Sequence, residues 1–150
     1  MAAPSALTLF ESFREYLGDG TFDMNSNTFK AQLHTSTFTP NAGTMSVLAD
    51  VNNEVGNGNG YATGGNTLAG VVWTRTGATL KFDANDTAWT GATAGFVARY
   101  LLLYASGTLN GRVNPLVGYM LLDSAPADVS FAAGNTVTVV WNASGIFTLS

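Results

Sequence analysis

The first residues that could do chemistry are the glycines of residues 53–68 (NEVGNGNGYATGGNTL), which could form a phosphate-binding loop. A dinucleotide fingerprint needs the pattern G-x-G-x-x-G at the start of a helix, and a P-loop needs Gly-Lys-Ser/Thr. Gly58 and Gly60 supply the first pair of glycines, but Thr63 occupies the third position and the stretch contains no lysine. The residues that follow, LAGVVWTR, are typical of a strand. The glycines therefore predict a tight surface turn.

His34 is the single imidazole of the chain. A Ser-His-Asp hydrolase would have to use it, and metal sites usually take more than one such ligand. It lies in TFKAQLHT (28–35), where Phe29, Ala31 and Leu33 alternate with polar residues. This alternation predicts a strand with His34 on its polar face, as a surface histidine.

Asp83, Asn85 and Asp86 (FDANDT) could offer oxygen ligands to a hard cation. The glycine and the closing glutamate of an EF-hand loop are missing, and an Asx-rich turn is favoured, although cation binding by Asp83 and Asp86 stays open. Asp19 and Asp23 flank another expected turn. No carboxylate pair has a catalytic setting, so we expect no enzyme activity, no metal and no cofactor.

Composition limits the partners of the chain. Ten acidic and six scattered basic residues give a net charge of −4, which does not favour nucleic-acid binding. The longest apolar run, 96–104, is interrupted by Arg99 and is far shorter than the roughly 20 residues that span a bilayer. There is no cysteine, and the first residues lack a basic region and an apolar core of the secretory type. We expect no membrane partner and synthesis in the cytoplasm.

The secondary-structure elements that position these residues are expected to be one helix followed by strands and turns. Leu9, Phe10, Phe13, Tyr16 and Leu17 have helical spacing, which predicts a helix near 5–17 that could cover one face of a central strand. Residues 45–51 fit either a helical turn or a strand. The expected strands lie at 28–35, 68–74, 78–82, 89–90, 96–104, 116–122, 136–141 and 145–149, and residues 142–144 are expected to join the last pair in a hairpin-like turn.

This pattern predicts a mainly β chain: one antiparallel β-sandwich, jelly-roll or immunoglobulin-like, of about eight strands with one N-terminal helix. Residues 1–18 form the N-terminal arm and helix, and residues 19–150 form the sandwich. From Thr87 onward the chain contains only four charged residues. A sparse charge on long strands favours association with a partner over a free monomer.

The order of several segments resembles a family of small structural proteins of tailed bacteriophages. The segments are the opening GDGTFDMNSNTFKAQLHTS, the turn NEVGNGNGYATGG, the strands AWT and ARYLLLY, and the closing WNASGI. They are spread over residues 18–146, so the resemblance extends over nearly the whole chain. The resemblance implies an N-terminal helix leading into a β-sandwich, no enzyme activity, and in some members a role as capsid decoration (cement) protein.

We therefore expect a virion protein on the capsid exterior that binds the major capsid protein and copies of itself, as a homo-oligomer for which a trimer is one form. The alternatives are a neck, tail or fibre component, and a carbohydrate- or receptor-binding sandwich that uses Tyr61, Trp73 and Trp89 as stacking platforms. The expected protein contacts are in the N-terminal arm and the glycine-rich loop: Ala2, Ala3, Pro4, Asn57, Gly58, Asn59, Gly60 and Tyr61.

Overall fold

The computed structural model describes residues 3–150 and confirms a mainly β, sandwich-like fold with antiparallel pairing and an N-terminal α-helix. Fourteen strands are present in the described residues, more than the predicted number, because residues 96–104 form two strands and five short strands of two or three residues were not predicted. The elements are β1 (Thr8–Leu9), α1 (Glu11–Gly18), β2 (Phe29–His34), a 3-10 helix (Leu48–Asp50), β3 (Asn66–Thr67), β4 (Val72–Thr76), β5 (Thr79–Asp83), β6 (Thr87–Thr90), β7 (Phe96–Ala98), β8 (Tyr100–Ala105), β9 (Thr108–Leu109), β10 (Arg112–Val113), β11 (Leu116–Leu121), β12 (Val129–Phe131), β13 (Thr136–Val139) and β14 (Phe147–Leu149).

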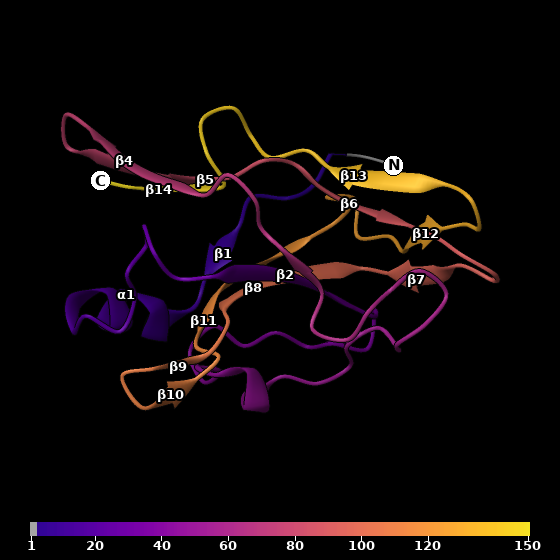
Figure 1. The fold of residues 1–150 in the computed structure, drawn as a ribbon, viewed down its shortest axis with the longest axis horizontal. Coiled ribbons are helices and arrows are strands. Elements are labelled where there is room, and N and C mark those ends of the chain that lie inside the picture. The colour runs from indigo at the N-terminus through magenta and orange to yellow at the C-terminus, as the bar shows by residue number, and fades with distance from the viewer. Residues whose placement is uncertain (1–2) are drawn as a thin grey trace.

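The second half of the chain forms one long antiparallel ribbon that is folded over into two layers. Its two arms pair in succession: β5 with β14, β6 with β13, β7 with β12, β8 with β11, and finally β9 with β10. The arms pass from one layer to the other in the turns between β6 and β7 and between β12 and β13. Figure 1 shows β4, β5, β6, β13 and β14 in one layer and β1, β2, β8 and β11 in the other.

The turns where the ribbon changes layer need glycine for its lack of a side chain. Gly91 and Ala133 form a bridge between the two arms, and the Gly91 amide donates to the carbonyl oxygen of Asn135 at 3.0 Å. A Cβ atom at Gly91 would lie 2.2 Å from the carbonyl oxygen of Phe131. Only a residue without a Cβ permits this approach of two backbones, so Gly91 helps to fix the fold of the ribbon.

The predicted strand at 96–104 is divided at Arg99 into β7 and β8 because the opposite arm carries an extra loop, residues 122–128, between β11 and β12. β8 is central in the five-stranded sheet, whose order is β1-β11-β8-β2-β3. All residues from Leu101 to Ala105 are buried, so β8 is a central strand that is covered on both faces.

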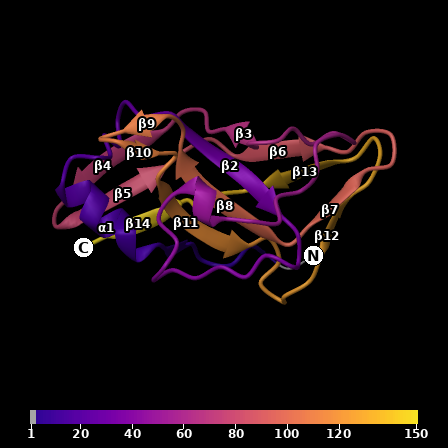
Figure 2. The same cartoon turned by 90° about the horizontal axis from the view of Figure 1, so that it is seen from below.

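Two apolar clusters cover the faces of β8. The larger lies between the layers and contains aromatic rings in contact, among them Phe29 and Phe82 with centroids 5.0 Å apart. The smaller lies on the outer face and includes Phe38 and Leu102. Residues 35–51, including the 3-10 helix, form its cover and lie in front of β8 and β11 in Figure 2. The helix α1 does not provide this cover, because its buried Phe13 and Tyr16 belong to the larger cluster.

The predicted start of the helix is wrong. Residues 5–9 are not helical, because they pair with β11: the Ser5 amide donates to Leu121 O at 3.0 Å, and the Leu121 amide donates to Ser5 Oγ at 2.9 Å. Ser5 therefore lies in an extended segment, and α1 begins at Glu11 after an extended Phe10. A long-range partner outweighs the helical spacing of the short segment.

The predicted hairpin-like join at 142–144 is also wrong. β13 pairs with β6 and β14 pairs with β5, so these consecutive strands do not pair with each other. Residues 140–146 instead form a loop at the side of the layer, and the Gly145 amide donates to Asn142 O at 2.7 Å.

Candidate functional site

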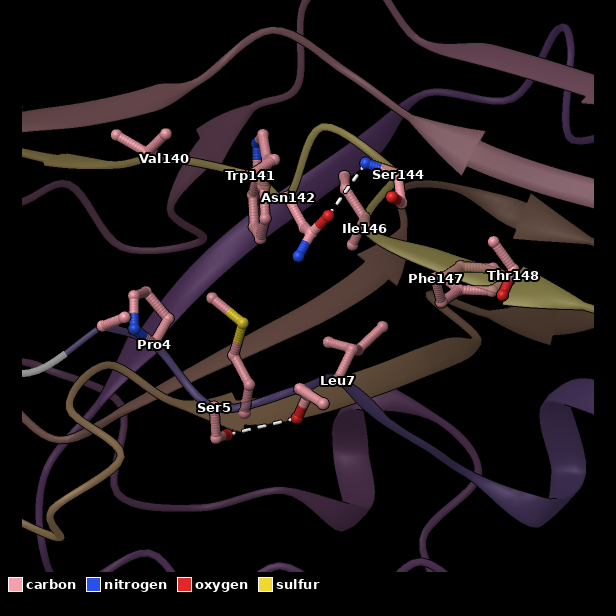
Figure 3. Close-up of a pocket in the computed structure, with 14 residues that line it drawn as sticks. Pro4, Ser5, Leu7, Val140, Trp141, Asn142, Ser144, Ile146, Phe147 and Thr148 are labelled. Atoms are coloured by element: carbon pink, nitrogen blue, oxygen red, sulfur yellow. Dashed lines mark hydrogen bonds between the residues drawn. The ribbon is translucent and has the colours of Figure 1, made fainter.

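A cavity of about 410 Å³ opens at the side of the sandwich, between the edge of one layer and the edge of the other (Figure 3). One wall is the N-terminal segment, where Pro4, Ser5 and Leu7 line the opening. The hydrogen bonds between Ser5 and Leu121 hold this segment along β11. The N-terminal arm is therefore an edge of the five-stranded sheet and not a free tail over the residues described.

The opposite wall is the loop of residues 140–146 together with the start of β14. Trp141 anchors this loop, because its amide donates to Asp86 Oδ1 at 2.9 Å and its indole Nε1 donates to Asn85 O at 3.1 Å. Asn142 Oδ1 accepts a hydrogen bond of 2.8 Å from the Ser144 amide and closes the turn. These bonds give the loop one conformation, which is the preorganisation that a binding surface needs.

The residues that line this cavity suit contact with another molecule and not a chemical reaction. Its fourteen lining residues include no acidic or basic side chain. Leu7, Met120 and Ile146 supply apolar surface, and Ser5 and Asn142 supply polar groups. Such a lining suits an apolar or main-chain segment of another molecule.

A second hollow, of about 660 Å³, lies on the ribbon between β12 and β13 and is lined in part by Ser130, Thr136 and Thr138. Asp128 at its rim forms an ion pair with Arg99, whose Nε lies 2.8 Å from the Asp128 Oδ1. Asp123 also lines this hollow, so two acidic side chains lie in its lining.

The ribbon carries an extended surface without charge. Residues 87–98 and 129–150, which we call the uncharged surface, contain no Asp, Glu, Lys, Arg or His. They form β6, β7, β12, β13 and β14 and their turns, and the exposed side chains are small or β-branched, for example Thr90, Thr138 and Val140. Val140 is 63% exposed. Thr90 and Thr136 share a hydrogen bond of 2.7 Å between their hydroxyl oxygens, so part of the polar surface is already satisfied.

Of the predicted contact residues in the N-terminal arm, Ala2 lies outside the described residues. Ala3 is exposed and its carbonyl oxygen accepts a hydrogen bond of 3.0 Å from the Ser124 amide. Pro4 is half-buried and, like Ala3, lines the cavity. Both are accessible at the sandwich edge.

The glycine-rich loop is a tight turn, as expected. Asn59 and Gly60 have φ values of 54° and 99°, and the amide and carbonyl groups of Gly58 and Tyr61 bond across them. Asn57 and Gly60 are exposed. The loop rests on the ribbon, because the Ala92 amide donates to Asn59 O at 2.8 Å.

Tyr61 is not a surface contact: its side chain is 3% exposed. Its hydroxyl donates to Glu54 Oε1 at 2.8 Å and accepts a hydrogen bond of 3.1 Å from the Leu33 amide. The Gly64 amide donates to the same Glu54 oxygen. Burial raises the pKa of Tyr61, and the Glu54 carboxylate raises it further. Tyr61 therefore anchors the glycine-rich loop to β2.

His34 is buried, so its prediction as a surface residue is wrong. Residues 35–51 cover the face of β2 that alternation marks as polar, and the His34 ring contacts Phe38 with centroids 4.6 Å apart. Nδ1 lies 2.8 Å from Asn52 O and Nε2 lies 2.9 Å from Gln32 Oε1. Burial lowers the pKa of His34. In the neutral ring Nδ1 carries the proton and donates to the carbonyl, so the Gln32 amide must turn its NH₂ toward Nε2.

The acidic residues singled out in the sequence hold turns and neighbouring elements. Asp83 forms an ion pair with Lys81 at 3.1 Å and accepts from the Ala84 amide, while Asp86 accepts from Trp141. Asp19 and Asp23 accept main-chain hydrogen bonds within their own turns, as expected. Within residues 3–150, no group of three or more His, Asp or Glu side chains is placed to hold a metal ion.

The aromatic platform of the carbohydrate-binding alternative is not formed. Trp89, like Tyr61, is buried, with 3% of its surface exposed. Trp73 is half-buried, and its ring lies 6.2 Å from Phe147 and 6.5 Å from Phe82. Sequence reasoning missed the loop of residues 140–146 as the second wall of the cavity. The low charge after Thr87 predicts an associating surface but not its shape.

Comparison of the chain with protein-family models, with curated proteins and with solved structures gives no match. Neither helix in the described part of the chain has the length and apolar character of a membrane span.

Proposed function

We propose that this protein is a non-enzymatic structural component of a bacteriophage virion, a decoration protein that binds the outer capsid surface and stabilises the contacts between capsomers. The observation that carries the proposal is the uncharged surface, residues 87–98 and 129–150. Its partners are the major capsid protein and other copies of this chain.

The cost of burial favours the uncharged surface as an interface. Ordering a long flexible side chain at an interface costs about 0.5–1.5 kcal/mol, and burying an unpaired charge costs more. The exposed side chains of β6 and β13, including Ala88, Thr90 and Thr138, lose little conformational freedom on contact. A surface built from them suits close packing against protein, which is what a cement protein requires.

The rigidity of the ribbon supports the same function. A clamp on a pressurised shell works through shape and stiffness, and not through reactive groups. The hydrogen bonds of Trp141 hold the loop 140–146 against the segment between β5 and β6. At Gly91 the backbones of the two turns of the ribbon pack directly against each other. Both features hold the uncharged surface in one shape.

Cryo-electron microscopy of virions assembled with and without the protein tests the proposal. We expect density at capsomer junctions that is missing when the protein is missing, and release of packaged DNA at a lower temperature from the depleted particles. Intact capsids without tails would instead assign the protein to the neck or tail. Unchanged particles, together with glycan binding that Trp73→Ala abolishes, would replace the proposal with a receptor-binding role.

A further inference from the structure

The strand β4 (Val72–Thr76) is the longest strand in the described residues that has a partner on one side only. It is the last strand of the sheet β14-β5-β4. Val72, Thr74, Arg75 and Thr76 are exposed. Figure 1 shows the β4–β5 hairpin projecting at one end of the molecule, in the layer opposite β9 and β10.

The hairpin geometry defines which main-chain groups face outward. A two-residue turn at Gly77–Ala78, with φ of 62° at Gly77, joins β4 to β5, and Thr76 pairs with Thr79. In such a hairpin the residues that flank the turn exchange hydrogen bonds, and the pattern alternates along the strands. Thr74 and Val72 therefore also bond to β5, whereas Trp73 and Arg75 direct their N–H and C=O groups to the open side.

Exposed edges of this length are usually protected by proline, lysine, a bulge or a short strand. The sequence VWTRT of β4 contains no proline and no lysine, and its pairing with β5 is regular over all five residues. Arg75 is its single charge. The edge is thus open to a strand that can accommodate one guanidinium group.

We propose that two copies of the chain pair through their β4 strands, antiparallel and centred on Thr74, so that the two three-stranded sheets become one continuous sheet. In this register Trp73 lies opposite Arg75 of the second copy, and Arg75 lies opposite Trp73 of the second copy. These are the residues with outward main-chain groups, so each pair exchanges N–H···O=C bonds. The contact is a closed two-fold arrangement.

The side chains select the same register. Trp73 lies on the inner face of the sheet against Phe82, and Arg75, two residues later, shares that face. The guanidinium group of one copy then lies beside the exposed part of the other copy's indole ring, a cation–π contact. A register centred on Arg75 would place the two Arg75 charges opposite each other. A shift by one residue would place the outward main-chain groups of one copy opposite main-chain groups of the other copy that already bond to β5.

On the outer face the same register opposes Thr74 to Thr74, and Val72 to Thr76 of the second copy. Val72 is 43% exposed in the single chain, and the pairing would cover it. The inference specifies how the proposed self-association takes place. It is carried by β4 alone, so it does not depend on a place in the virion.

A cysteine scan of the full chain tests the register, because the chain has no cysteine of its own. Thr74→Cys places two thiols in a non-hydrogen-bonded pair with Cα atoms about 4.5 Å apart, within the range for a disulfide. We expect rapid oxidation to a covalent dimer. Thr76→Cys, on the same face and also exposed, faces Val72 and is the matched control that stays uncross-linked. A mixture of Thr76→Cys and Val72→Cys chains, in contrast, cross-links.

Sedimentation of the unmodified chain tests the dimer itself. We expect a species of twice 15.6 kDa at micromolar concentration. For Thr74→Glu we expect at least a tenfold weaker association, because the two Glu carboxylates would lie opposite each other across the dimer contact. Within its own hairpin the same Glu would face Lys81. A monomer at tens of micromolar, or equal cross-linking of Thr74→Cys and Thr76→Cys, overturns the inference. A dimer that binds no capsid would overturn the proposed function and leave this inference in place.

Discussion

Removing the hydroxyl group of Tyr61 should loosen the glycine-rich loop and destabilise the whole chain. In Tyr61→Phe the Leu33 amide loses its 3.1 Å acceptor, and the Glu54 carboxylate loses its 2.8 Å donor. A buried N–H group without a partner costs about 1–3 kcal/mol, and a hydrogen bond to a charged group contributes about 1.5–3 kcal/mol.

The two losses do not add in full. Glu54 is half-buried, and it keeps the bond from the Gly64 amide, so water can replace part of the lost interaction. We therefore expect Tyr61→Phe to lower the free energy of unfolding by about 2–4 kcal/mol. With a urea m-value of about 2 kcal/mol/M, the midpoint falls by about 1–2 M.

Urea denaturation followed by tryptophan fluorescence measures this change, with Tyr119→Phe as the control. Tyr119 is half-buried against Phe10, with ring centroids 5.3 Å apart, and its hydroxyl has no hydrogen-bond partner within residues 3–150. Its loss should change the free energy of unfolding by less than about 0.5 kcal/mol. If the two variants unfold at the same urea concentration, the assignment of Tyr61 as the anchor of the loop is refuted.

Three further changes test other parts of the account. Burial lowers the folded-state pKa of His34 below its ordinary value of 6.5. The contribution of the neutral ring to the free energy of unfolding is therefore complete above pH 6.5 and is lost as the pH falls below it. Between pH 7 and pH 5, His34→Gln should lose less stability than the wild type, as measured by denaturation. Gly91→Ala would bring a methyl group to 2.2 Å from a carbonyl oxygen of β12 and should cost more than about 2 kcal/mol, whereas Gly56→Ala, which meets nothing within 4 Å, should be near neutral in thermal unfolding. Thr138→Lys, on the uncharged surface, should weaken capsid binding at least tenfold while Thr39→Lys, on a distant exposed loop, does not; equal binding would contradict the assigned interface.

Local pattern predicted part of the strands and turns of this chain. The strand 28–35 and the strand 116–122 appear as β2 and β11, and residues 45–51 contain both a 3-10 helix and a bridge from Val47 to Pro115, so each of the two open alternatives holds in part. Asn59-Gly60 forms the expected turn because both residues tolerate positive φ. These features depend on neighbours in sequence.

The errors share a long-range cause. Ser5 pairs with Leu121 and so leaves the predicted helix, and the extra loop opposite Arg99 divides the strand 96–104 into two. His34 is buried because residues 35–51 fold back over β2. Each outcome is decided by residues outside the local segment. The alternation of polar and apolar residues within a strand does not indicate whether another segment covers its polar face.

The candidate site was predicted only in part. The N-terminal arm lies at the sandwich edge, where Ala3 is exposed. For the other wall, the sequence predicts a hairpin-like turn at 142–144 and not the loop of residues 140–146. Low charge after Thr87 predicted an associating surface, although not its shape. That shape follows from the ribbon, which gathers two separate stretches of sequence into one surface.

The proposed interface is tested by a cryo-electron microscopy map of virions that carry the protein, at a resolution that shows its orientation. We expect residues 87–98 and 129–150 to face neighbouring shell subunits, with the charged residues of α1 on the solvent side. A map in which the uncharged surface faces solvent, or in which the capsid carries no copy of the protein, would contradict it.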